Sequence, residues 1–307
     1  MLVARQIQPI ITLAAAAGTS FNGNDTAKYD GLRVRVSISK GGTPQLDTAE
    51  IRIWGMPLSD MNAVSRLGKP LTWTRDNQIT INAGDTDSGM SQVFTGSMNS
   101  AYVDFQPPEA SLNIMAISRL VELTKAVPPS SFPGNASIDT IGNAIATKMG
   151  LGFQNSGVNW QTNNAYFTGS AKAQMDAVAK AANCQWTPNG GSNGNLLEVW
   201  PKGVPRGSSG ITLSPQSGLI GYPTFQDVGV LLRHLYVPGI GFGQSFQLQS
   251  SILPTSTWWV LHNQIELGCN DPEGDNPWEQ EITATNVNIT GQTAPQAEAT
   301  LGNLTGG

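Results

Sequence analysis

The fold class is decided by two stretches, LRVRVSI at residues 32–38 and AEIRIW at residues 49–54. Apolar and polar residues alternate in both, which is the period of a half-buried β-strand. Valine and isoleucine therefore face one side, and Arg33, Arg35, Glu50 and Arg52 face the other. The letters GGTP at 41–44 form a turn signal between the two stretches. We predict two neighbouring strands with one buried face and one charged face.

Residues 1–120 are expected to form a first small, closed β-barrel domain. Leu58, Met61, Val64 and Leu67 recur at helical spacing and predict one short helix that covers an end of the barrel, with Gly68 as its C-cap. A first strand is expected near the N-terminus, with a secretory signal as the less favoured alternative. Further strands are predicted at 71–75, 78–83, 91–103 and 110–117.

Residues 121–200 show helical as well as strand periodicity, and they predict an α+β insert. A loop is predicted at 128–134, in the letters PPSSFPG. Two helices should follow, capped at their N-termini by Ser137 and Ser170, and the first should end at Gly150. The apolar stripe of the first helix is Ile138, Ile141, Ile145 and Met149, and the inner face of the second is Met175, Val178 and Ala182. A strand at 195–200 closes the module.

Residues 201–285 are expected to form a second small β-barrel domain, related to the first. A linker is predicted at 201–210, and strands at 211–213, 218–223, 229–236, 245–249, 258–268 and 278–285. Residues 286–307 lack apolar periodicity and are expected to form a tail that is flexible or ordered by a neighbour. The predicted class is mainly β, with two barrels flanking a helical module.

Composition narrows the possible partners. Only 13% of residues are Asp, Glu, Lys or Arg, against roughly 25% in an ordinary globular protein. The polar surface must therefore come from Asn, Gln, Ser and Thr, which suits a chain packed against others, although a Thr/Asn-rich β protein without partners has the same composition. The net charge of −5 and the absence of any Lys/Arg run argue against a nucleic-acid patch. No apolar run reaches the ~20 residues of a membrane span.

Residues with catalytic or ligand-binding potential are few. The two cysteines, Cys184 and Cys269, predict buried free thiols, with a single bridge as the alternative. His234 and His262 lack the spacing of a metal site and are interpreted as structural or surface histidines. Gly96-Ser97 lies within a predicted strand rather than at a nucleophile elbow. We therefore assign no catalytic, cofactor-binding or metal-binding residue, and expect no cofactor.

Three loops and the tryptophans were considered as binding sites. The glycine-rich stretch at 239–243 predicts a β-turn rather than a nucleotide loop. The acidic loop at 271–276 has carboxylates at alternate positions, as in calcium loops, but Ile282 stands where the distal glutamate is needed, so a solvated hairpin is favoured. The same holds for Asp85-Thr86-Asp87. Eight tryptophans predict core positions, with an exposed sugar- or protein-binding platform as the alternative.

One distinctive segment resembles a known family. The letters LSPQSGLIGYPTF at 213–225, followed by VLLRHLYVP at 230–238, QLQS at 247–250 and a tryptophan-led strand at 258–267 before Trp278, resemble the baseplate hub proteins of tailed phages. The insert is similar to the small helical insert of these hubs at 141–150, 158–160, 169–183 and 196–200. The likeness of the first barrel is limited to residues 51–54 and the helix that follows. The resemblance covers about residues 30–285.

The resemblance implies a structural, non-enzymatic virion protein that is made in the host cytoplasm. It implies a homotrimer in which two barrels per chain give six, matching the sixfold tail tube above, while a threefold spike or tip attaches below. The implied partners are the tube and spike proteins, with the tape measure protein and other baseplate proteins as further contacts. Genome DNA would pass through the channel without specific binding, and no membrane is involved. Barrel edges would be paired across chains.

The sequence departs from the family pattern in places and is compatible with other functions. The chain lacks a recognisable lysozyme or spike domain, and residues 121–200 show no sugar site. A carbohydrate- or receptor-binding β protein of the tail-fibre type predicts exposed tryptophans clustered on one face. A hydrolase with an unrecognised site predicts a cleft holding a strongly perturbed acid or base. A related bacterial injection system is a variant of the hub interpretation.

Overall fold

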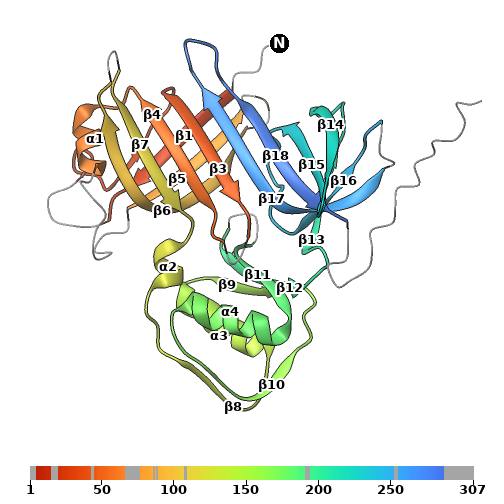
Figure 1. Ribbon diagram of the computed structural model, residues 1–307. Helices are drawn as coiled ribbons and strands as arrows, with labels where there is room; N and C mark the ends of the chain where they lie inside the picture. Colours follow the sequence, from red (N-terminus) through yellow and green to blue (C-terminus); the bar gives the residue numbers. More distant parts are fainter. Residues whose placement is uncertain are drawn as a thin grey trace, which may run out of the picture.

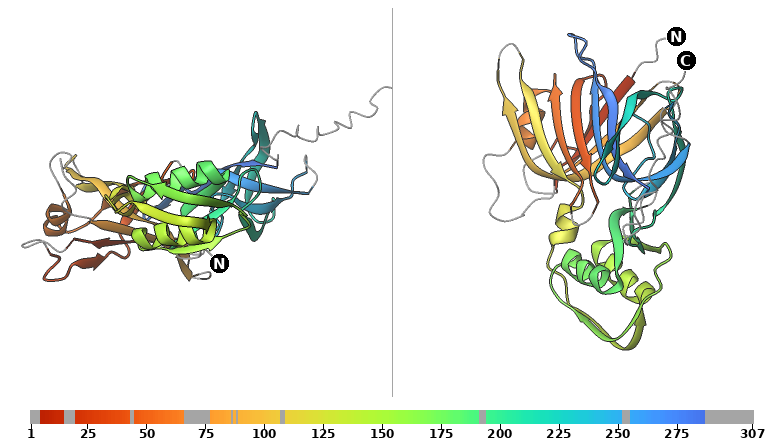
Figure 2. Two further views of the ribbon diagram at one scale, coloured as in Figure 1. Left: turned by 90° about the horizontal axis from the view of Figure 1, so that it is seen from below. Right: turned by 45° about the vertical axis from the view of Figure 1, so that its right-hand side comes forward.

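The computed structural model describes residues 5–14, 20–42, 45–65, 77–85, 87, 89–106, 109–190, 194–251 and 255–286. Strands dominate, and they form two β halves that lie side by side, with a helical module below them (Figure 1). The predicted class, mainly β with an α+β insert, is confirmed. The view turned by 45° shows the same arrangement of the two halves above the insert (Figure 2).

The first β half follows the predicted alternation. Val34, Val36 and Ile38 are buried in one strand, while Arg35 of the same strand is exposed. The half contains β1 (Arg5–Thr12), β2 (Thr26–Lys28), β3 (Arg33–Lys40), β4 (Thr48–Trp54), α1 (Leu58–Val64), β5 (Gln78–Asp85), β6 (Gly89–Asp104) and β7 (Ser111–Ile117). The N-terminal segment thus forms a strand, as expected.

Helix α1 is shorter than predicted. It ends at Val64, with Ser65 as its C-cap, because the Ser65 backbone turns to an extended conformation and its N–H and hydroxyl both donate to the Met61 carbonyl. Leu58 is exposed rather than part of the inner face. The predicted cap Gly68 and the predicted strand at 71–75 lie outside the described residues.

The insert contains both predicted helices. Ser137 accepts a hydrogen bond from the Thr140 N–H at 3.3 Å, Ser170 accepts one from the Ala173 N–H at 3.2 Å, and Gly150 ends the first helix in the left-handed conformation. The elements are α2 (Leu120–Thr124), β8 (Ser130–Ser137), α3 (Ile138–Met149), β9 (Gly152–Asn155), β10 (Gln161–Phe167), α4 (Ala171–Ala182), β11 (Cys184–Gly190) and β12 (Leu196–Pro201).

The loop predicted at 128–134 is wrong from Ser130 onward, because these residues form β8. This strand pairs with β10, and a register shift between Phe132 and Asn135 accommodates Pro133 and Gly134 inside a strand that has only one neighbour. The β8–β10 ribbon lies at the end of the insert farthest from the β halves (Figure 1). Local turn signals alone therefore mispredicted this edge strand.

The second β half contains the six predicted strands. They are β13 (Gly207–Leu213), β14 (Leu219–Gln226), β15 (Gly229–Leu235), β16 (Gln244–Leu248), β17 (Ser256–Cys269) and β18 (Trp278–Thr285). The predicted linker at 201–210 is shorter than expected, because β12 continues to Pro201 and β13 begins at Gly207. Of the predicted tail at 286–307, residues 287–307 lie outside the described part of the chain.

The two halves merge into one sheet through β17, and this corrects the expectation of two closed barrels. The first part of β17 pairs with β16, whereas its residues Asn263–Cys269 pair with β3 of the first half. The sheet runs β14-β15-β18-β17-β3-β4-β7-β6-β5-β1-β2, and no ladder among the described strands closes it into a barrel. One long strand serves both halves, because β17 pairs with β16 at its start and with β3 at its end.

Three hydrophobic clusters lie within this frame. The first fills the first half but also takes Ile265, Leu267 and Cys269 from β17. The second lies within the insert, between α3, α4 and the strands beside them. The third fills the second half around Phe246 and Trp258.

None of the helices described is long and apolar enough to cross a membrane.

Candidate assembly surface

Eight strands form a wide surface that both halves share. In the order β14-β15-β18-β17-β3-β4-β7-β6, every neighbouring pair is antiparallel. One side of this sheet packs on the two cores, and the other carries the charged side chains predicted from the alternation. We call this second side the polar face; its charged and amide residues are Arg33, Arg35, Glu50, Arg52, Asp104, Asn113, Arg233, Gln264, Glu266, Glu279 and Glu281.

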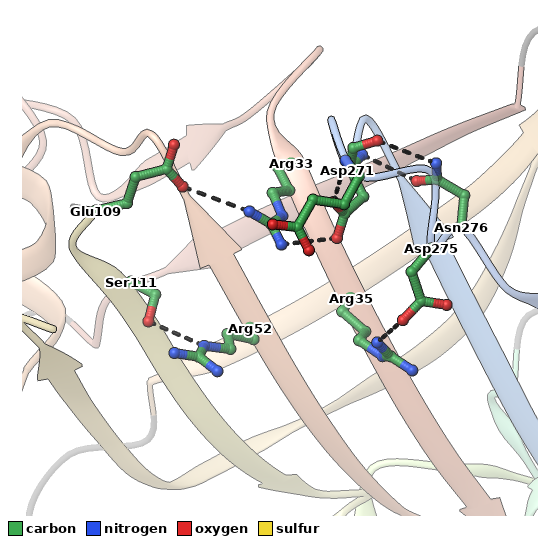
Figure 3. Close-up of polar contacts among 9 residues, drawn as sticks. Arg33, Arg35, Arg52, Glu109, Ser111, Asp271, Asp275 and Asn276 are labelled. Carbon is green, nitrogen blue, oxygen red and sulfur yellow. Dashed lines mark hydrogen bonds and ion pairs between the residues drawn. The ribbon is translucent and has the colours of Figure 1, made fainter. Parts of the chain in front are cut away.

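The acidic loop between β17 and β18 folds over the polar face and neutralises two of its arginines (Figure 3). Oδ2 of Asp271 lies 2.7 Å from the Arg33 guanidinium, and Oδ2 of Asp275 lies 2.6 Å from that of Arg35. Asn276 accepts a hydrogen bond from the Asp271 N–H at 2.9 Å and so fixes the loop. Two of the three loop carboxylates, Asp271 and Asp275, are thus turned to arginines, and no cluster of three metal-ligating side chains occurs among the described residues.

The remaining arginines of the polar face are also paired. Arg52 donates to Ser111 at 3.0 Å and lies 3.3 Å from Asp104, while Arg233 lies 2.7 Å from Glu279. The guanidinium groups of Arg33 and Arg52 both stack on the Trp54 ring, at 4.3 and 4.9 Å from its centroid. Each of the four arginines is therefore held in place by a carboxylate.

Carboxylates outnumber arginines on this surface. Glu266 stands directly opposite Glu279 across the β17–β18 pair, an arrangement that repels. Ser37 and Gln264 each donate a hydrogen bond to Glu266, at 2.7 and 3.1 Å, which offsets part of this cost. Glu50 and Glu281 add further negative charge. The polar face is acidic, with its positive charges already satisfied.

Large exposed apolar side chains stand at both lateral ends of the polar face. Tyr102 and Met115 form the β6 edge patch. Ile220 and Leu235 form the β14 edge patch, and the exposed Tyr222 lies next to Ile220 in the chain, where the β14–β15 register is broken. Sequence reasoning missed both patches, because each combines residues from two strands whose pairing the local pattern does not specify.

His234 is fully buried and serves the turn before β14. Its Nδ1–H donates to the Leu235 carbonyl, so Nε2 is the acceptor for the Ser217 hydroxyl at 3.0 Å. Ser217 Oγ also accepts from the Ser214 N–H at 2.8 Å and thereby closes the turn. Burial lowers the pKa of His234 below the usual histidine value, which favours this neutral form. The His262 side chain contacts that of Ser39 of β3 at 2.9 Å, next to Asn263, where the β17–β3 pairing begins.

The remaining candidate residues from the sequence lie in turns, strands or the protein interior. Gly239–Gly243 lies between β15 and β16, and Ser97 is buried within β6. Asp85 ends β5 and accepts a hydrogen bond from the N–H of Asp87, which lies in the turn before β6. Cys184 and Cys269 are buried free thiols, as predicted. The tryptophans other than Trp73, which lies outside the described residues, are buried or half-buried, so the described chain lacks the exposed tryptophan platform expected of a fibre-type binding protein.

A buried polar junction joins the three parts of the chain, and the sequence held no sign of it. Arg206 and Glu198 lie 3.2 Å apart, with side chains only 9% and 8% exposed. Asp47 accepts from Asn189 at 2.9 Å, and Lys40 donates to the Val93 carbonyl at 2.7 Å. Burial raises the pKa of Asp47 and lowers the pKa of Lys40 and of Arg206. These side chains line a cavity of about 510 Å³.

The family comparison agrees with this architecture. Residues 16–261 match the family described as Baseplate hub gp41. The chain belongs to this family. It is thus a structural component of the phage tail baseplate, as the resemblance of the 213–225 segment implied. A search of curated proteins found no matching relative.

Solved structures with the hub fold are similar in shape and distant in sequence. The 43 kDa tail protein of prophage MuSo2 from Shewanella oneidensis has a TM-score of 0.60 at 9% identity, over 92% of this chain and 97% of that one. The tail protein from Neisseria meningitidis MC58 has a TM-score of 0.57 at 7% identity, over 90% and 96%. The Escherichia coli type VI secretion component c3393 has a TM-score of 0.51 at 11% identity, over 82% and 73%.

Proposed function

We propose that three copies of this hub chain form a ring that adapts the sixfold tail tube to the threefold tail tip or spike. Each copy contributes two β halves, so three copies present six, which is the number that a sixfold tube requires. The observation that carries the proposal is the continuous antiparallel surface shared by the two halves. A surface built from both halves of every copy is suited to line a common channel.

The charges of the polar face support its place in the channel wall. An arginine that already contacts a carboxylate has little capacity left for a phosphate, because the pair must break before a new contact forms. Arg33, Arg35, Arg52 and Arg233 are all in this state. The surplus of carboxylates repels the DNA backbone. Genome DNA would therefore pass along this wall without specific binding.

The neighbours and the lack of catalysis follow from the same proposal. The tail tube protein would bind above the ring and the spike or tip protein below, with the tape measure protein and other baseplate proteins as further contacts. We assign no catalytic, cofactor-binding or metal-binding residues, and the protein would act without enzymatic activity. It would be made in the host cytoplasm and would function in the virion.

Measurement of particle size and shape tests the proposal. The purified full chain is expected to have the mass of three copies, and electron microscopy should reveal a threefold ring with six lobes. Adding purified tail tube protein should produce a stacked complex. A chain that stays monomeric at high concentration, and forms no ring when tube protein is added, would contradict the proposal.

A further inference from the structure

The insert is held together by its own core and its own sheets. Every buried residue of its hydrophobic cluster lies between Leu123 and Val199. Among the described strands, those of the insert pair only with one another, whereas the two β halves share one large sheet. Leu46 is the one apolar residue of the described first half that packs against the insert core. The insert can therefore keep its fold when its contacts with the β halves change.

The contact between the insert and the second half is buried and partly aromatic. Trp200 of β12 is fully buried, and its ring centroid lies 5.7 Å from that of Phe242. A Cβ atom on Gly243 would lie only 2.9 Å from the same ring. The guanidinium of Arg206 lies 5.9 Å from the Trp200 centroid and pairs with Glu198 of the insert. We call Trp200, Phe242, Glu198 and Arg206 the anchor, because separating them would expose an indole and divide a buried ion pair.

The contact between the insert and the first half is mainly polar. The Asn189 side chain of the insert is held from two sides. Its Oδ1 accepts a hydrogen bond from the Ser118 hydroxyl at 3.0 Å, and its Nδ2 donates one to Asp47 at 2.9 Å. We call Asn189, Ser118 and Asp47 the latch. Its hydrogen bonds can be exchanged for bonds to water at a small net cost, so the latch opens more readily than the anchor.

The cavity of about 510 Å³ at the junction lies between all three parts of the chain. Polar side chains from each part line it, among them Thr95 of the first half, Gln154 of the insert and Gln244 of the second half. Protein interiors are normally close-packed, so the insert is not packed tightly against the β halves here. A polar cavity of this size admits water, which can bond to the groups of the latch once they separate.

Both chain connections to the insert contain a residue with an unusual backbone conformation. Ser118 and Arg119 join β7 to α2, and Arg119 has a φ of +54°, which residues other than glycine rarely adopt. Its guanidinium donates to the Gly194 carbonyl at 2.6 Å and to Asn195 at 2.7 Å, so this side chain is bound to the insert. The connection from β12 to β13 contains Gly203, with a φ of +84°. Hinges in proteins are a few such residues at the ends of elements.

We propose that the insert is a hinged arm, which separates from the first half at the latch and stays attached to the second half at the anchor. This inference concerns a single chain and goes beyond the proposed ring. The β8–β10 ribbon lies farthest from the β halves, so the motion displaces this ribbon most (Figure 1). The two halves keep their arrangement during the motion, because β17 pairs with strands of both.

A distance measurement between two spin labels tests the hinge. In the full-length chain, Leu58→Cys on α1 and Tyr166→Cys on β10 provide labelling sites, since these positions are 55% and 64% exposed and the native thiols are buried. Labelled chains are diluted with unlabelled wild type, so that distances between copies are not detected. Asn189→Ala deletes both hydrogen bonds of the latch and should raise the population of longer distances roughly tenfold. Asn163→Ala, at an exposed asparagine of the same insert, is the matched control and should change nothing.

A second variant opens the latch from the other side. Ser118→Ala removes one of the two hydrogen bonds and should give the same new distance at a lower population. Reactivity of Cys184 and Cys269 toward a thiol reagent, measured without the labelling sites, reports whether the cores of the insert and of the first half stay folded. Distance distributions that match the wild type in both variants would overturn the inference. Longer distances that appear only together with a reactive Cys184 would also overturn it, because the insert would then unfold rather than swing.

Discussion

Asp271 and Arg33 are 238 positions apart in the chain, and their side chains meet at 2.7 Å on the polar face. The Asp271 side chain is 12% exposed, so the pair is partly shielded from water and ions. Arg33 also lies 3.5 Å from Glu109 and rests on the Trp54 ring. The alternation of residues 32–38 predicted that Arg33 lies on an open surface. In the structure, a loop from the other end of the chain holds this arginine in place (Figure 3).

Freeing the arginines should make the polar face bind DNA. In Asp271→Asn/Asp275→Asn, Arg33 loses its short carboxylate contact and Arg35 loses its partner, and both become available to phosphates. We expect measurable binding of duplex DNA at low ionic strength, with a salt slope steeper by roughly one per freed arginine. Asp25→Asn/Asp87→Asn has the same charge change in other loops and should bind no better than wild type. Equal binding by the two double variants would argue against a masked arginine surface.

The buried His234 predicts a loss of stability in acid. Burial lowers its pKa, so the unfolded chain takes up the proton at a higher pH than the folded chain. The stabilising contribution of neutral His234 is therefore fully present above pH 6.5, the ordinary pKa of histidine. It is lost as the pH falls below that value. Chemical denaturation at about pH 8 and about pH 5 should show this loss, and His234→Gln should reduce it. If the variant loses as much stability between the two pH values as wild type, His234 is not the cause.

Removing one partner of the Arg206–Glu198 pair should lower the free energy of unfolding more than removing both. Glu198→Gln leaves a buried guanidinium without its carboxylate, which should cost about 3 kcal/mol of unfolding free energy. Replacing both partners, as Glu198→Leu/Arg206→Met, should be much less costly, because neither member of the pair is then left buried without the other. Glu273→Gln, at an exposed glutamate, serves as the control. A double variant as unstable as Glu198→Gln would show that packing rather than charge sets the cost.

Gly229 begins β15 at a position that tolerates no side chain. A Cβ atom there would lie 2.0 Å from the backbone oxygen of Ala284, and the φ of +151° adds strain. Gly229→Ala should therefore destabilise the protein by about 3 kcal/mol or more, seen as a lower denaturation midpoint. Gly207→Ala has open space around its Cβ and should have little effect. Similar midpoints for the two variants would be inconsistent with this geometry.

Local signals predicted local structure well. The caps Ser137, Ser170 and Gly150 were predicted because a cap depends on residues within one turn of it. The strands of the second half were predicted because alternation and turn residues are also local. The loop at 128–134 was mispredicted because Pro133 and Gly134 act as breakers unless a partner strand accommodates them, and β10 does so through a register shift.

The pairing of strands that are far apart in the chain could not be predicted from the sequence. The partnership of β17 with β3 joins segments more than 200 residues apart, and no local pattern specifies it. The same is true of Asp271 with Arg33, of the junction around Asp47, and of the two edge patches. The resemblance of residues 213–225 led to the family, but the surfaces depend on which strands become neighbours, and that is a property of the whole chain.

The sharing of β17 also has a consequence for the order of folding. The core of the first half contains Ile265, Leu267 and Cys269, which leave the ribosome long after the strands they complete. The first half therefore cannot finish its core during synthesis of its own residues, and its closing step must wait for nearly the whole chain. A chain that stops before β17 therefore lacks part of the first core and also the strand that joins the two halves.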